Sequence, residues 1–276
     1  MECGGRDDGA GWRCEGRFLK MSKTNRDGCF GIEALTQETM VECGRALEAL
    51  GKAGKSRQGV AQGIVDYFYE HFRSPESEEP SCVLVRCFQT SSYASLPLDY
   101  RDAADRLLDF TPIDRRMRCL ALLATRGDRT VWNDVATSIA HQAIPLPSVE
   151  VVRRAPMIAR LLEQLGVPIE RLVALKPDAG FVMEESDESF NVFHVPQALA
   201  SPFIPAQESF VEPFGVQSVV GMGGVLADGE FFAVILFTRV AVTREVAELF
   251  RTLALSVKAA LLPFDSNRVF NGPRFL

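Results

Sequence analysis

The sequence predicts an α+β fold, and three observations carry this prediction. Both ends of the chain contain segments in which apolar residues recur at the period of an amphipathic helix. Between them lie short runs rich in β-branched and aromatic residues, which are typical of strands. The dipeptide Asp228-Gly229 separates the last two runs, and a tight hairpin turn favours Asp-Gly because its centre needs positive φ. The chain therefore combines helices with at least one antiparallel strand pair.

The chain begins with a segment that we do not expect to fold. Residues 1–30 are rich in glycine and charge and lack periodicity, so they bury too little apolar surface to offset the entropy lost on ordering. We therefore predict that residues 1–30 are disordered. A second methionine, Met21, leaves open whether the natural start is Met1 or Met21.

Two helices are expected next. An apolar stripe at helical spacing predicts the first over residues 32–50, and Gly51 and Gly54 end it. A similar stripe predicts the second over residues 58–72, before an acidic loop that begins at Pro75. Both helices have one apolar face to bury, so they pack on the rest of the domain.

The middle of the chain changes to short apolar runs. "CVLVRCFQT" (residues 82–90), "RCLALLAT" (118–125) and "ESFNVFHV" (188–195) each predict a strand. Helical patterns predict a short helix over residues 99–110 and a longer one over 151–166.

The end of the chain has the clearest pattern. Strands are expected over residues 216–226 and 230–239, joined by the Asp-Gly turn. Thr243 can cap a long amphipathic helix that Pro263 ends, and residues 266–276 read as an unstructured tail. No repeat and no long linker interrupts the chain, so we expect residues 31–265 to form one domain.

The glycines of "GMGG" raise the question of a phosphate-binding loop. Such a loop opens a helix, so that backbone amides and the helix dipole meet the phosphate. Here Gly221 and Gly223 are followed by a strand. We interpret them as part of a strand that another element approaches closely.

Bulk properties exclude some classes of protein. The net charge is −6 over 276 residues, with no basic block, which argues against nucleic-acid binding. No apolar run is long enough to span a membrane, and no signal-peptide core follows the first charges, so we expect a cytoplasmic protein without a membrane partner. The seven cysteines form no CxxC pair and are expected to be reduced thiols.

The C-terminal part resembles the end of a GAF domain. The segments "FGVQSVVGMGGVL" and "ADGEFFAVILF" and the helix after Thr243 follow the order and spacing of that family. The resemblance implies a central antiparallel sheet of five to six strands with the N- and C-terminal helices on one face. The middle region, residues 92–212, is longer than in a plain GAF domain and would cover the other face.

The same resemblance implies a function in sensing. The chain is similar to the N-terminal sensory regions of bacterial histidine kinases and regulators, so we expect a small-molecule or cofactor ligand and signal transduction through a partner such as a histidine kinase or a missing output domain. The apolar faces of the terminal helices could pair in a homodimer. A small redox or hydrolytic enzyme on a GAF fold, and a ligand-free interaction module, stay open as alternatives.

The resemblance directs the search for a ligand site to the middle region. His141 and His194 both lead into proline-containing irregular backbone there, and imidazole binds haem, metals or anions. Trp132, Phe193 and Phe203 are candidates for an apolar lining. No catalytic residue is assigned, because no nucleophile motif occurs, and no HExxH or CxxC spacing indicates a metal. The cofactor stays open, with haem and non-haem iron among the alternatives.

Overall fold

One antiparallel sheet runs through the part of the chain that the structure describes. The computed structural model describes residues 29–74, 76–108, 113–174, 191–264 and 269–271. Their six strands lie in the order β3-β2-β1-β6-β5-β4, and all neighbours are antiparallel. The strands are β1 (Cys82–Ser92), β2 (Arg118–Gly127), β3 (Ala143–Leu146), β4 (Val192–Val195), β5 (Ser218–Val225) and β6 (Phe231–Thr238). The α+β class and the antiparallel sheet are confirmed.

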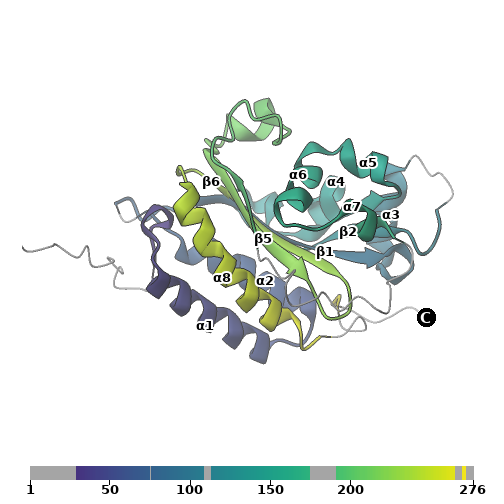
Figure 1. The fold of residues 1–276 in the computed structure, drawn as a ribbon, viewed down its shortest axis with the longest axis horizontal. Coiled ribbons are helices and arrows are strands. Elements are labelled where there is room, and N and C mark those ends of the chain that lie inside the picture. Colours follow the sequence, from purple (N-terminus) through teal and green to yellow (C-terminus); the bar gives the residue numbers. More distant parts are fainter. Residues whose placement is uncertain (1–28, 75, 109–112, 175–190, 265–268, 272–276) are drawn as a thin grey trace, which may run out of the picture.

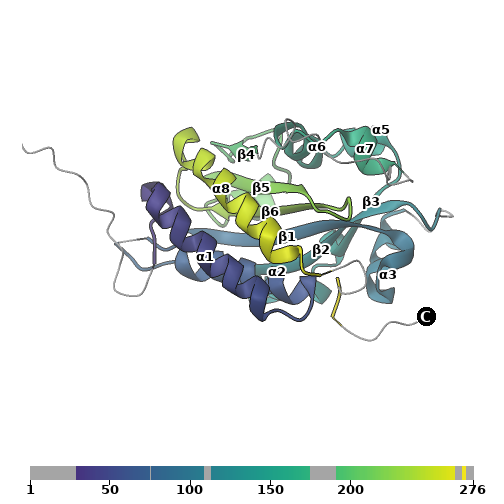
Figure 2. The same cartoon turned by 60° about the horizontal axis from the view of Figure 1, so that its bottom comes forward.

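Three long helices cover the first face of the sheet. They are α1 (Gln37–Ala53), α2 (Arg57–His71) and α8 (Arg244–Leu261), and Figures 1 and 2 show them together on one side. Their apolar stripes and the inward residues of the strands form one core, in which Phe68, Phe232 and Phe250 are fully buried. Thr243 caps α8 by accepting a hydrogen bond from the Val246 amide, as its sequence predicts.

The second face is covered by the middle of the chain. Short helices α5 (Val149–Arg153), α6 (Pro156–Gln164) and α7 (Ile169–Val173) lie over it, with a π-helical turn at Gln207–Val211. Leu161, Leu162 and Leu172 join its core. Two further helices, α3 (Leu98–Leu107) and α4 (Ile139–Gln142), lie toward the β2–β3 edge of the sheet.

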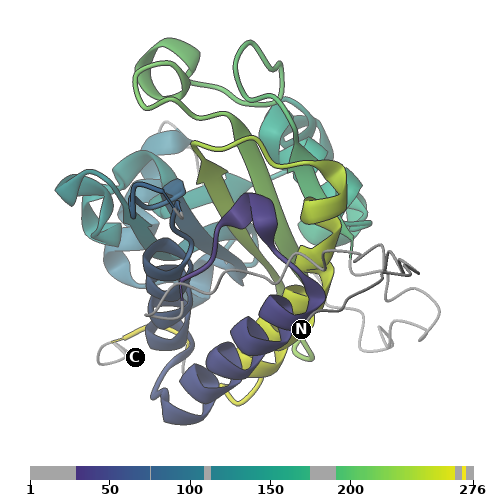
Figure 3. The ribbon, with the colours of Figure 1, turned by 90° about the vertical axis from the view of Figure 1, so that its left-hand side faces the viewer.

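Glycines allow two close approaches in this fold. A Cβ added at Gly51 of α1 would lie 2.6 Å from the Ala260 Cα of α8, so only glycine allows these two helices to pack so tightly. Figure 3 shows α1 lying against α8. A Cβ at Gly223 would lie 2.4 Å from the carbonyl oxygen of Phe232. Gly221 and Gly223 lie inside β5, which confirms the strand interpretation of "GMGG".

Prolines explain two differences from the expected elements. The helix expected over residues 151–166 is two helices, because Pro156 has no amide hydrogen and disfavours helical backbone at Ala155, so it begins α6. The edge strand β3 was not predicted. Its Pro145 pairs with Cys119, and an edge strand tolerates proline because one side of its backbone needs no partner.

The hairpin turn also differs from the expected one. The expected primed turn is a two-residue loop with a positive φ at one or both central residues. Among the residues of this turn, only Gly229 has a positive φ, of 79°. The Gly229 amide bonds the Leu226 carbonyl oxygen at 3.0 Å, and the Leu226 amide bonds the Glu230 carbonyl oxygen at 2.8 Å. The loop is therefore longer by one residue, with glycine in the left-handed position.

The ends of the domain reach slightly beyond their expected bounds. Phe30 is buried and its backbone bridges to Phe72. Val269 is buried, and the Asn271 amide bonds the Gln58 side chain at 2.8 Å, so this part of the expected tail packs on α2. Residues 1–28 lie outside the described part of the chain.

Ala206, in the segment that covers the second face, carries backbone strain. Ala206, which precedes the π-helical turn, has φ 60° and ψ 42°. Left-handed backbone brings the alanine Cβ close to the backbone, so Ala206→Gly is expected to raise the free energy of unfolding by about 1 kcal/mol. Urea denaturation measures this. The matched variant Ala227→Gly, at a position without positive φ, should lose a few tenths of a kcal/mol instead, and equal effects in the two variants would contradict the strain.

Candidate functional site

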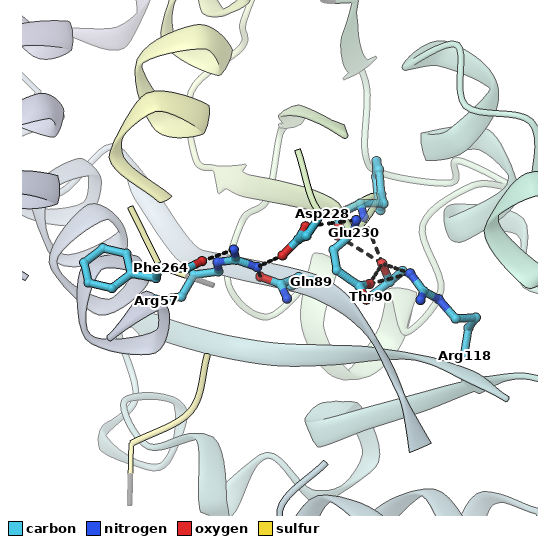
Figure 4. A network of polar contacts seen from close by, with 8 residues as sticks. Arg57, Gln89, Thr90, Arg118, Asp228, Glu230 and Phe264 are labelled. Atoms are coloured by element: carbon cyan, nitrogen blue, oxygen red, sulfur yellow. Dashed lines mark hydrogen bonds and ion pairs between the residues drawn. The ribbon is translucent and has the colours of Figure 1, made fainter. Parts of the chain in front are cut away.

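Three arginines reach the interior of the domain, and their partners differ. Arg57 is 2% exposed on the first face. Its Nη1 donates to Asp228 Oδ2 at 2.9 Å and to Gln89 Oε1 at 3.1 Å, and its Nη2 donates to the Phe264 carbonyl oxygen (Figure 4). This guanidinium joins α2 to β1, to the β5–β6 turn and to the segment after α8.

The second arginine, Arg118, is also paired. It forms an ion pair with Glu230 and donates to Thr90 Oγ1 at 3.1 Å (Figure 4). Burial raises the pKa of the Glu230 carboxyl, while the positive charge of Arg118 acts in the opposite direction. Thr90 Oγ1 also accepts from the Phe231 amide at 2.8 Å. Carboxylates of the β5–β6 turn therefore neutralise both Arg57 and Arg118, which gives these two arginines a structural role.

The third arginine, Arg86, has no such partner. It lies in the middle of β1, between Thr125 of β2 and Ile235 of β6. Its neighbours Val85 and Cys87 belong to the first-face core, so Arg86 points to the second face because side chains alternate along a strand. The side chain is partly buried, and its Nε is shielded from solvent without a hydrogen-bond partner.

Arg86 is costly for the fold. It forms no ion pair and no side-chain hydrogen bond with any residue in the described part of the chain. Loss of hydration lowers the pKa of its guanidinium to about 10. A partly buried charge that is less well hydrated than in the unfolded chain, and that has no counterion among the described residues, destabilises the folded state. A negatively charged ligand group would remove this cost.

A second polar group without a partner lies beside Arg86. Thr125 is paired directly with Arg86 across β1 and β2, so the two side chains share the second face. Its hydroxyl is fully buried and has no hydrogen-bond partner among the described residues. The neighbours on the same face are apolar: Leu84, Phe88 and Ile235 belong to the second-face core. Arg86 and Thr125 thus form a polar pair in apolar surroundings.

His141, in α4, completes the site. Its residue is exposed to solvent, yet burial of the ring and the positive charge of Arg86 lower its pKa from 6.5 to about 4. The positive charge of Arg86 acts on this ring, and His141 is neutral at pH 7.

The three aromatic candidates all lie on the second face. Trp132 packs over Gly127, with its ring 4.7 Å from Phe214 between centroids. Phe193 is fully buried in the second-face core. Phe203 lies under the guanidinium of Arg160, 5.0 Å from its ring centroid. Of these three, Trp132 lies nearest to the strand that carries Thr125, because it packs over Gly127, two residues from Thr125 in β2.

The structure does not bring His194 together with His141. His194 lies in β4, at the opposite edge of the sheet from β3. Its Nε2 lies 2.9 Å from the Val242 carbonyl oxygen near the start of α8, and burial lowers its pKa, while this contact with Val242 raises it. Its amide donates to Gln164 Oε1 at 2.8 Å. These contacts are those of a histidine satisfied by the fold.

The sequence pattern alone did not single out Arg86 and Thr125. One feature could have identified Arg86, since it is the charged residue inside the otherwise apolar run "CVLVRCFQT". A charge at the centre of a buried strand needs a partner or a function. Thr125 becomes visible only when the strand register is known, because a threonine near a strand end is ordinary.

No protein-family model matches the chain, and no curated protein matches it in sequence. Within the described residues, no helix is long and apolar enough to cross a membrane. The same residues contain no group of three or more His, Cys, Asp or Glu side chains placed to hold a metal ion.

The low pKa of His141 predicts a pH dependence of stability. The unfolded state protonates near 6.5 and the folded state near 4, so the unfolded state binds more protons between these values. Stability is therefore full above pH 6.5 and falls as pH decreases toward 4. Because solvent reaches the ring, we expect a loss of about 1 kcal/mol rather than the full value of the shift.

Urea denaturation at pH 7 and pH 4.5 measures this loss, and His141→Gln isolates it from other titrating groups. The loss between the two pH values should be smaller in His141→Gln than in the natural chain. His71→Gln is the control, because the His71 ring lies elsewhere, at the end of α2, where it stacks on Tyr67 and its Nδ1 lies 3.0 Å from the Tyr67 carbonyl oxygen. Identical pH dependence in the natural chain and His141→Gln would contradict the placement of His141.

Proposed function

We propose that the protein is a GAF-like regulatory domain that binds a small anionic molecule over the second face of its sheet. The observation that carries the proposal is Arg86, a guanidinium on the central strand without a counterion among the described residues. A natural sequence keeps such a destabilising group where function needs it. The ligand supplies the negative charge that the described residues do not.

The site offers three donors to such a ligand. The Arg86 guanidinium can donate two parallel hydrogen bonds to one carboxylate. The Thr125 hydroxyl can donate a third, and the neutral His141 ring carries one N–H at pH 7. Bound in apolar surroundings, an anion pairs with Arg86 more strongly than it would in water.

Ligand binding would act as a signal by shifting populations of the domain. The second-face cover contains short helices and the strained Ala206, whereas the first face has a continuous core. A ligand that favours one arrangement of the cover stabilises that arrangement by its difference in affinity. We propose that the change reaches α1 and α8 and is read by a homodimer partner or a signalling protein such as a histidine kinase.

The alternative with a specific observation is an enzyme that uses His141 as a general base. A base works best when its pKa lies near the working pH. The pKa of His141 is about 4, which leaves the ring a weak base at neutral pH. A binding role fits this property better than a catalytic one.

Selective retention of small molecules tests the proposal. The full chain is incubated with a bacterial metabolite extract and dialysed, and retained compounds are identified by mass spectrometry for the natural chain, Arg86→Met and Arg251→Met. Arg251 is an exposed arginine of α8 and serves as the matched control. Anionic compounds should be retained by the natural chain and Arg251→Met and lost in Arg86→Met. Equal retention in all three, or no retention, would overturn the proposal.

A further inference from the structure

We infer that the ligand is an organic monocarboxylate with an apolar body, whose carboxylate binds Arg86 and Thr125 and whose body extends along the second face toward Trp132. This inference rests on the proposed function and specifies the chemistry of the ligand. Two observations support it: the number of hydrogen-bond donors at the site and the pattern of apolar side chains beside it.

The donors suit one carboxylate better than a phosphate. The fork of a guanidinium matches the two oxygens of a carboxylate, and one hydroxyl can satisfy a remaining lone pair. A phosphate carries more charge and three terminal oxygens, and its sites add backbone amides of a glycine loop or a helix N-terminus. Around Arg86 the same face offers Leu84, Phe88 and Ile235, which have no donors in their side chains.

The apolar part of the site lies two residues further along the strands. Arg86, Thr125 and Ile235 form one row across the sheet, and the next row on the same face contains Leu84, Gly127 and Phe237. Two residues along a strand span about 7 Å, which is close to the length of a phenyl ring with its first substituent. A ligand held by its carboxylate at the first row therefore directs its body toward the side chains that cover the second row, Trp132 and Phe210.

That second row carries an aromatic surface. A Cβ added at Gly127 would lie 3.0 Å from Trp132 Cε3, so the indole covers this glycine. The Trp132 ring contacts Phe210 and Phe214, with centroids 5.5 and 4.7 Å away, and Phe210 contacts Phe237 at 5.2 Å. Aromatic side chains next to a polar anchor are the usual lining of a small-molecule site.

Calorimetry with three probes tests the inference. Phenylacetate carries both features, 2-phenylethanol keeps the aromatic body without charge, and inorganic phosphate carries charge without the body. Each is titrated into the full natural chain, Arg86→Met and the control Arg251→Met. Phenylacetate should bind the natural chain and Arg251→Met and lose at least tenfold in affinity in Arg86→Met. The other two probes should bind at least tenfold more weakly than phenylacetate.

The outcomes separate the inference from the proposed function. If phosphate binds more tightly than phenylacetate and needs Arg86, the ligand class is wrong and the anion site stands. If 2-phenylethanol binds as well as phenylacetate in both the natural chain and Arg86→Met, both the class and the role of Arg86 are wrong. If none of the probes binds and the retention experiment also finds no anion, the proposed function falls with the inference.

Discussion

Replacing Arg86 with methionine is expected to raise the free energy of unfolding of the ligand-free protein by about 1–3 kcal/mol. Methionine keeps most of the length of the side chain and fits the apolar neighbours Leu84, Phe88 and Ile235. The substitution removes a partly buried charge that has no counterion among the described residues. Most substitutions of interior residues destabilise a protein, so a gain here would be specific to the unpaired charge.

Urea denaturation of the extensively dialysed full chain measures this gain. Urea is preferred to guanidinium chloride, because chloride could occupy the anion site and guanidinium could compete with the side chain. Arg251→Met, on the exposed surface of α8, should change stability by less than about 0.5 kcal/mol. A clear loss of stability in Arg86→Met would show that Arg86 serves the fold, and the proposed site would be wrong.

Replacing Arg57 with methionine is expected to have the opposite effect, a loss of about 3 kcal/mol. The Arg57 guanidinium is nearly inaccessible, and it bonds the Asp228 carboxylate, the Gln89 amide oxygen and the Phe264 carbonyl oxygen. Its removal leaves Gln89 and the Phe264 carbonyl without this donor, and leaves the Asp228 charge without its ion pair. The β5–β6 turn also loses its connection to α2.

The second substitution Asp228→Asn makes this test sharper. If the loss comes from an uncompensated carboxylate, the double variant should recover part of it, which a double-mutant cycle by urea denaturation measures. Additive losses in the cycle, or a loss below 1 kcal/mol in Arg57→Met, would show that the pair behaves like an exposed ion pair.

The sequence was most informative where local rules act without help from distant residues. The helix after Thr243 has a capping hydroxyl, an acidic first turn and a continuous apolar stripe, and α8 begins and ends where these features predict. The Asp-Gly turn located the β5–β6 hairpin, although its loop proved longer. These features depend on residues within a few positions of one another.

The expectations failed where tertiary contacts decide the structure. The edge strand β3 is short and contains Pro145, so it has no strand pattern of its own, and pairing with β2 creates it. Phe30 and Val269 lie in segments of low periodicity, yet both are buried against the domain. Contacts between distant parts of the chain are invisible in the period of a single segment.

The candidate site was predicted in part for the same reason. His141 and Trp132 were candidates because the resemblance directed attention to the middle region, and the proposed site includes both. His194 was grouped with them because its surroundings in the sequence look similar, but strand order places β4 at the far edge of the sheet. Arg86 lies in the first strand, outside the middle region, and only the fold brings its charge within electrostatic reach of His141.

The pKa of His141, measured by NMR, tests the central claim most directly. The chain has three histidines, so His141→Gln assigns the resonance of this ring. With Arg86 unpaired, the pKa should be about 4 in the free protein, rise toward 6.5 in Arg86→Met, and rise on adding phenylacetate to the natural chain, because the carboxylate neutralises Arg86. An unchanged pKa in both Arg86→Met and the phenylacetate-saturated natural chain would contradict an anion site at Arg86.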